Sequence, residues 1–185
     1  FMLLLSGCQG SDPKGDPLLD ILDSKDPAIA RVMKNPGEYK IQIHYTRIAR
    51  TGDSVRFTDY TYGLDKDRYF YPASTVKFPI AVAALEKLNT LDSLDRDSRY
   101  YIEGDSVENT FAEDIEKIFA VSDNPASNRL IEFLGQDEIN TRISAKKAGP
   151  IRISHRLGYH REDLTPQPLV LYLNDSLTTL TNPII

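Results

Sequence analysis

The chain has 185 residues, of which 41% are hydrophobic and 26% charged, and its formal net charge is −5 at pH 7. This composition is typical of a globular domain with a sizeable core, and it excludes a disordered chain or a bundle of membrane helices. The acidic balance and the lack of a basic stripe argue against a nucleic-acid-binding protein.

The N-terminus carries a short apolar run, then small residues and the single cysteine, Cys8. One cysteine cannot form an internal disulfide. Leu5-Ser6-Gly7-Cys8 resembles a bacterial lipobox, which implies lipidation of Cys8 at the cell envelope and removal of residues 1–7. The alternative is an apolar N-terminus with a buried cysteine. We expect residues 1–17 to be a signal remnant and tether, and residues 18–185 to form one domain.

The first predicted elements are a helix and a hairpin. Asp16 and Pro17 suit the cap and the first turn of a helix whose apolar positions continue past Pro27. Alternation over residues 39–48 predicts a half-buried strand, and residues 55–62 predict its partner after a turn.

Helices dominate the rest of the prediction. Residues 76–88 are apolar on nearly every side, which is typical of a helix buried inside a domain. Further helices are predicted over residues 113–121, 124–134 and 137–148. Residues 89–112 and 165–185 show no clear periodicity of hydrophobic residues, so no helix or strand is predicted there.

Ser74 and Lys77 stand where an aromatic segment turns into the apolar helix. A serine hydroxyl keeps its proton at neutral pH and needs a nearby base to become a nucleophile. Residues three apart on a helix face the same side, and the helix start adds N–H groups and a partial positive charge. The same spacing begins at Ser11 and at Ser144, so spacing alone is weak. The structural alternative is a helix cap beside an extended Lys77 side chain.

Ser122-Asp123-Asn124 lies between two predicted helices, where side chains can point into a cleft. The alternative is simple helix punctuation, with Asn124 as the cap. Ser74-Thr75-Val76-Lys77, followed in this order by Ser122-Asp123-Asn124, resembles the first two motifs of the class A β-lactamase-like serine hydrolases, which belong to the penicillin-recognising enzymes.

This resemblance implies an α/β fold, with an antiparallel sheet flanked by helices and a helical subdomain. It implies that Ser74 attacks the carbonyl of a β-lactam or an acyl-D-alanyl peptide and forms an acyl-enzyme. Lys77 would take or relay the proton, Ser122 would pass a proton to the departing nitrogen, and Asn124 would bind the substrate amide. The implied partners are this small molecule or peptide and, through Cys8, a membrane.

Two features depart from the family pattern. The third motif, Lys-Thr-Gly or Lys-Ser-Gly, does not occur, and Arg50-Thr51-Gly52 precedes the nucleophile. We therefore expect the C-terminal part of the sheet to be missing and these 185 residues alone to be weakly active or inactive. Glu162 lies where a deacylating carboxylate is expected, but the Asn four residues later is absent. A D,D-peptidase and a non-catalytic envelope lipoprotein stay open as alternatives.

No metal or cofactor is predicted. The three histidines, His44, His155 and His160, do not share a metal-ligand spacing. No phosphate-binding loop or dinucleotide fingerprint is present in the sequence.

Overall fold

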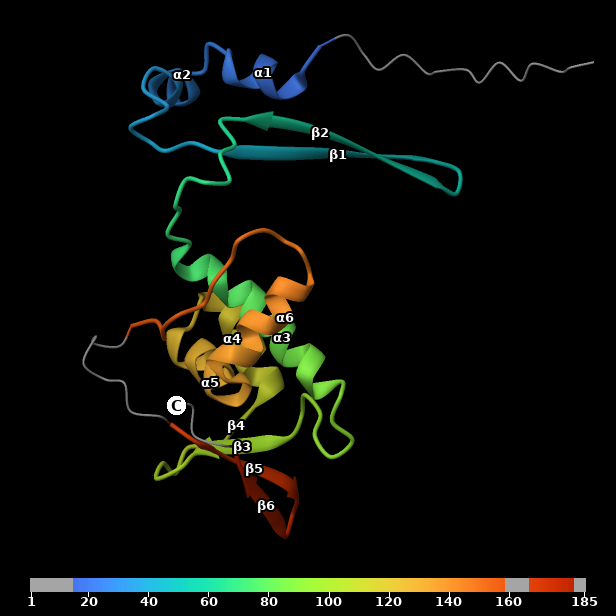
Figure 1. Ribbon diagram of the computed structural model, residues 1–185, viewed down its shortest axis with the longest axis vertical. Coiled ribbons are helices and arrows are strands. Elements are labelled where there is room, and N and C mark those ends of the chain that lie inside the picture. The colour runs from blue at the N-terminus through green and yellow to red at the C-terminus, as the bar shows by residue number, and fades with distance from the viewer. Residues whose placement is uncertain (1–14, 159–166, 182–185) are drawn as a thin grey trace, which may run out of the picture. The chain divides into compact units, whose positions relative to one another are not determined.

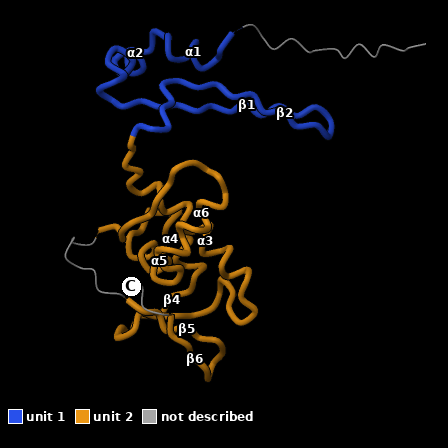
Figure 2. Tube along the Cα trace, in the orientation of Figure 1, with its two compact units in different colours: residues 1–68 blue, residues 69–185 orange. Residues whose placement is uncertain are grey.

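The structure is a computed structural model that describes residues 15–158 and 167–181 (Figure 1). Its contacts divide the chain into two compact units, residues 1–68 and 69–185 (Figure 2). Each unit has its own antiparallel sheet, two-stranded in the first and four-stranded in the second. This mixture of helices and antiparallel sheets confirms the expected fold class.

The first unit begins with two short helices, α1 (Pro17–Leu22) and α2 (Pro27–Met33). Asp16 caps α1 by accepting from two backbone N–H groups, and Asp26 does the same for α2. Each helix has proline in its first turn, where a backbone N–H has no helical partner to lose. The one helix predicted here is therefore two, because Asp26 and Pro27 begin a new helix.

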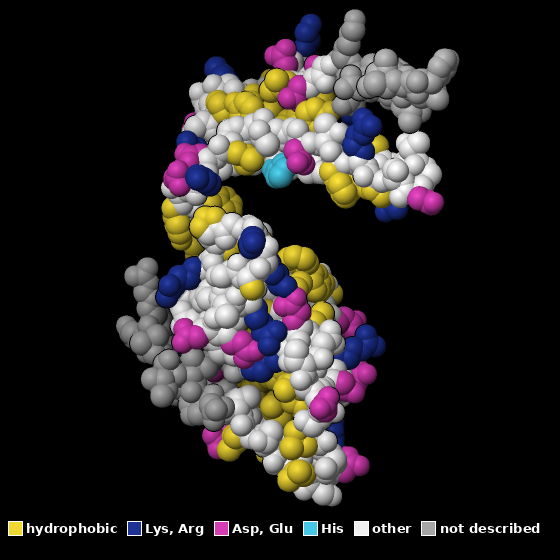
Figure 3. All heavy atoms as spheres, turned by 45° about the vertical axis from the view of Figure 1, so that its right-hand side comes forward, with side chains coloured by type: hydrophobic (Ala, Val, Ile, Leu, Met, Phe, Trp, Pro, Cys, Tyr) yellow, Lys and Arg dark blue, Asp and Glu magenta, His cyan; other side chains and the backbone are white. Residues whose placement is uncertain are grey.

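A hairpin of β1 (Ile43–Thr51) and β2 (Ser54–Tyr62) completes the first unit. The strands pair in register from Ile43 opposite Tyr62 to the tight turn at Gly52, whose φ of +59° suits glycine. The predicted half-burial of the first strand is wrong, since no residue of β1 is buried. Figure 3 shows hydrophobic side chains at the surface of this unit.

The core of the second unit is built from helices. A 3₁₀ turn, η1 (Ala73–Val76), runs directly into α3 (Lys77–Leu88). The other helices in the described part of this unit are α4 (Phe111–Val121), α5 (Asn124–Leu134) and α6 (Gln136–Ala145). Helix α5 contacts α3, α4 and α6, and eight of its eleven residues are buried, so it is the centre of the core.

The second sheet has the order β4-β3-β5-β6 and is antiparallel throughout. Its strands are β3 (Arg99–Ile102), β4 (Asn109–Thr110), β5 (Leu169–Asn174) and β6 (Leu177–Leu180). The sheet reaches the core through Tyr100, whose ring lies 4.6 Å from that of Phe111, between centroids. None of the described helices combines the length and apolar character needed to cross a bilayer.

Candidate active site

Ser74 and Lys77 meet at the start of the buried helix. The 3₁₀ turn has three residues per turn, so side chains at positions i and i+3 lie one above the other. Lys77 Nζ donates to Ser74 Oγ at 3.2 Å. Ser74 is exposed while Lys77 is only 2% exposed, so the hydroxyl is open to solvent and the amine lies behind it.

Ser122 approaches the same amine from α4. It ends this helix in the left-handed conformation, with φ of +56°, and its N–H donates to Ile118 at 3.0 Å. The turn aims both the hydroxyl and the carbonyl of Ser122 at α3. Lys77 Nζ donates to Ser122 Oγ at 3.0 Å and also contacts the Ser122 carbonyl oxygen. One amine therefore contacts both hydroxyls that the sequence singled out.

Backbone strain coincides with this site. Ser122 and Ala73, which directly precedes Ser74, are two of the four non-glycine residues with positive φ in the described chain. Such conformations are disfavoured for residues with a Cβ atom, and they persist where the surrounding structure enforces them. The strain therefore falls on the two turns that present the two hydroxyls.

Asn124 is placed differently from the sequence interpretation. Asp123, and not Asn124, caps α5, because its carboxylate accepts from the Ala126 N–H at 2.7 Å. Asn124 is the first residue of the helix, and its side chain lies against Gly158, where an added Cβ would come within 2.9 Å of Asn124 Nδ2. In the described part of the chain, no hydrogen bond joins Asn124 to the lysine or to the two serines.

Helix α5 also binds Arg156, Leu157 and Gln167 through two of its polar side chains. Asn128 exchanges two hydrogen bonds with the Leu157 backbone, at 2.7 and 2.9 Å. Glu132 pairs with Arg156 at 2.9 Å and accepts from the Gln167 N–H at 3.3 Å. Asn128 and Glu132 were missed in the sequence, although two polar residues spaced four apart share one face of a helix and are a usable signal.

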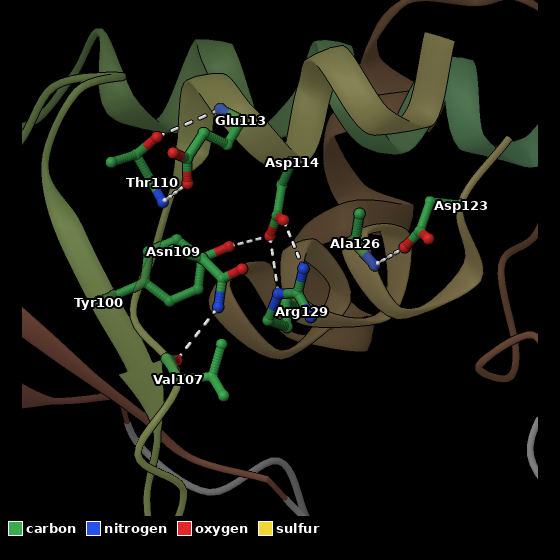
Figure 4. A network of polar contacts seen from close by, with 9 residues as sticks. All are labelled: Tyr100, Val107, Asn109, Thr110, Glu113, Asp114, Asp123, Ala126 and Arg129. Atoms are coloured by element: carbon green, nitrogen blue, oxygen red, sulfur yellow. Dashed lines mark hydrogen bonds and ion pairs between the residues drawn. The ribbon is translucent and has the colours of Figure 1, made fainter. Parts of the chain in front are cut away.

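A buried polar network links the helices on either side of Ser122 (Figure 4). Asp114, in α4, is fully buried and accepts from two nitrogens of Arg129, in α5, with Nε at 2.9 Å. The Tyr100 hydroxyl donates to the same carboxylate. Burial, together with the charge of Asp114, raises the pKa of Tyr100 far above its usual value, so this phenol keeps its proton.

The pKa of Arg129 is also set by burial and by Asp114. Burial alone would lower the pKa of Arg129, but the hydrogen bonds and charge of Asp114 raise it above its ordinary value. Arg129 therefore keeps its proton beside the buried Asp114 side chain. The signal available in the sequence was Asp114, an acidic residue on the apolar side of the helix predicted over residues 113–121.

Other predicted residues lie elsewhere. Cys8, His160 and Glu162 fall outside the described residues. His44 pairs with Asp59 at 3.2 Å in the hairpin, and His155 stacks on Tyr71. Within the described ranges, no cluster of histidine, cysteine or acidic residues has the geometry of a metal site.

Comparison with known proteins identifies the family. A sequence model of the beta-lactamase enzyme family matches residues 26–180. No curated protein and no solved structure matches the chain. The family match covers both turns that carry the serines and most of the two units. The chain therefore belongs to the beta-lactamase enzyme family and is a β-lactamase-like serine hydrolase.

Proposed function

We propose that this protein hydrolyses β-lactams through an acyl-enzyme formed on Ser74. The observation that carries the proposal is the position of Lys77 Nζ, 3.2 Å from Ser74 Oγ and 3.0 Å from Ser122 Oγ. An exposed hydroxyl beside a buried amine is the arrangement that an activated serine requires. The Ser122 hydroxyl, which also contacts Lys77 Nζ, can pass a proton on to the leaving nitrogen.

The acylation step follows from these contacts. Ser74 Oγ attacks the lactam carbonyl carbon while Lys77 Nζ, as the base, takes its proton. The carbonyl oxygen becomes an oxyanion, and the Ser74 backbone N–H at the helix start is one donor available to it. As the ring C–N bond breaks, Ser122 gives its proton to the departing nitrogen and regains one from Lys77. Water then hydrolyses the ester and releases Ser74.

The Ser122 carbonyl has a part in this scheme. It holds Lys77 Nζ from one side, so the amine stays between the two hydroxyls instead of extending into solvent. Because Lys77 is 2% exposed, few waters compete for its hydrogen bonds. Asn124, at the first turn of the next helix, is the residue we propose to bind the substrate amide.

The test is the intact mass of the full-length protein after incubation with a β-lactam. We expect an added mass on Ser74 and none in Ser74→Ala. Ser144→Ala is the matched control, because Ser144 has the same spacing to a lysine but lies exposed in α6. An adduct in Ser74→Ala would overturn the assignment of the nucleophile.

The lifetime of the adduct separates the alternatives. Rapid turnover of a chromogenic cephalosporin supports a β-lactamase, and its expression should then raise antibiotic resistance. A persistent adduct supports a D,D-peptidase that acts on peptidoglycan peptides. Neither an adduct nor turnover supports a non-catalytic protein that keeps the fold.

We also propose that Cys8 anchors the protein to the bacterial cell envelope, on the strength of Leu5-Ser6-Gly7-Cys8. Cells fed a labelled fatty acid should incorporate the label into the full-length protein. Cys8→Ser should abolish incorporation, and label retained in that variant would contradict the anchor.

A further inference from the structure

We propose that Asp114 and Arg129 are positioning residues, which hold Ser122 against Lys77 by fixing how α4 crosses α5. The kinetic part of this inference rests on the proposed acyl-enzyme chemistry, and the structural part does not. The pair touches none of the reacting groups, so its effect would act through the Ser122 turn.

The position of the pair in the chain is the first argument. Helix α4 ends at Val121 and α5 begins at Asn124, so Ser122 and Asp123 are the whole connection between them. Asp114 lies two helical turns before this connection, and Arg129 lies nearly two turns after it. A contact between these side chains therefore closes the helical hairpin whose tip presents Ser122.

The geometry of the contact is the second argument. Arg129 binds Asp114 through two nitrogens, and this planar fork fixes orientation as well as distance. Asp114 is 0% exposed, so solvent offers the carboxylate no alternative partner. Tyr100 donates to it from β3 and ties the hairpin of helices to the sheet (Figure 4). Three elements thus meet at one carboxylate.

The strain at Ser122 is the third argument. A serine with φ of +56° is held in a conformation that it rarely adopts alone. Its N–H bond to Ile118 and the Asp123 cap on α5 stabilise the two helix ends separately. Only a contact between the helices fixes the angle at which those ends meet. The Asp114–Arg129 pair is the ion pair that spans α4 and α5 in the described chain.

The test compares this pair with a second ion pair. Arg129→Lys keeps the charge but loses the fork. The triple variant Tyr100→Phe, Asp114→Leu, Arg129→Met removes the network without leaving a buried unpaired group, a kind of replacement that proteins often tolerate. The control is Glu138→Gln, which removes the negative charge from the 2.7 Å ion pair of Lys87 with Glu138 between α3 and α6.

Two readouts are measured on folded full-length protein, well below each melting temperature. The first is the rate of adduct formation on Ser74, which we expect to fall at least about tenfold in both network variants, because small displacements of a reacting group are costly. The second is hydrogen exchange over residues 118–123, which we expect to rise in the same variants. Glu138→Gln should change neither.

Each outcome decides the matter. Wild-type acylation rates and exchange in a folded triple variant would overturn the inference and leave the proposed function intact. Equal losses in the control would also overturn it, because they would show a general effect of stability. If the unmodified protein neither forms an adduct nor turns over a β-lactam, the proposed function fails, and the exchange data alone decide whether the pair holds the Ser122 turn.

Discussion

The two serine–lysine pairs at 74–77 and 144–147 share one spacing and have opposite surroundings. Ser74 lies in the turn that starts a helix, and Lys77 is buried against Ser122. Ser144 lies in the last turn of α6, and Lys147 follows the end of that helix with φ of +53°. Two residues three positions apart face the same side only while the helix continues. The place of the motif in its helix therefore matters more than the identity of its residues.

The largest expected effect concerns the two lysines. Lys77→Met keeps the length of the side chain and removes the amine between the hydroxyls. Because this amine is the proposed proton acceptor, we expect adduct formation on Ser74 to slow by up to about 10⁴-fold. Lys147→Met is the control and should leave the rate unchanged. Timed intact-mass measurements check both variants. Equal rates of adduct formation in the two variants would contradict a special role for Lys77.

The next effect concerns the buried network of Asp114 and Arg129 behind Ser122. Arg129→Met leaves the buried Asp114 carboxylate without its ion pair, and breaking such a pair costs about 3–5 kcal/mol. Lys87→Met breaks a contact whose partners are 22% and 33% exposed, so its cost is closer to about 1 kcal/mol. Urea unfolding monitored by circular dichroism measures both. Similar losses in the two variants would contradict the ranking.

A smaller effect separates stability from activity at the second serine. Ser122→Gly removes the hydroxyl but suits the φ of +56° better than serine does. We expect the free energy of unfolding to rise by about 1 kcal/mol, because glycine has no Cβ penalty in this region. Adduct formation should fall, since the proton path to the leaving nitrogen is lost.

Ser144→Gly is the control for that variant. Ser144 lies in a regular helix, where glycine weakens the backbone by about 1 kcal/mol. Thermal unfolding should therefore shift upward for Ser122→Gly and downward for Ser144→Gly. A downward shift in both would mean that the left-handed turn carries no strain.

The local elements of the fold could be predicted from the sequence. The hairpin followed from alternation and a glycine turn, and the helices followed from apolar periodicity. The second sheet could not be predicted, because β4 has two residues and β5 is a continuous apolar run. Its pairing is also non-local, since Tyr100 lies opposite Leu171. No window of sequence contains both strands.

The candidate site divides in the same way. Ser74, Lys77 and Ser122 could be named in advance because two short motifs carry them, and the structure brings their side chains together. Their catalytic roles stay a prediction. Asp114 and Arg129 could not be paired in advance, since nothing in the sequence gives the angle between two helices. The alternative in which Asn124 caps the helix was wrong, because the helix begins one residue earlier and Asp123 accepts from the Ala126 N–H.

The smallest expected effect concerns α6, the helix that carries the second serine–lysine pair. Burial raises the pKa of Glu138, but its bonds to Lys87 and Arg142 outweigh this and leave the pKa below its ordinary value of 4.5. A carboxylate with a lowered pKa in the folded protein stabilises it above that ordinary value, and the contribution disappears as the pH falls through the folded pKa. The wild-type protein should therefore lose more stability than Glu138→Gln between pH 6 and pH 3 (about a few tenths of a kcal/mol, given the partial exposure). Unfolding curves across this range measure the difference. Parallel curves would show that the ion pair adds nothing, and α6 would then owe its place to its other contacts, such as those of Asn140 with Ile153.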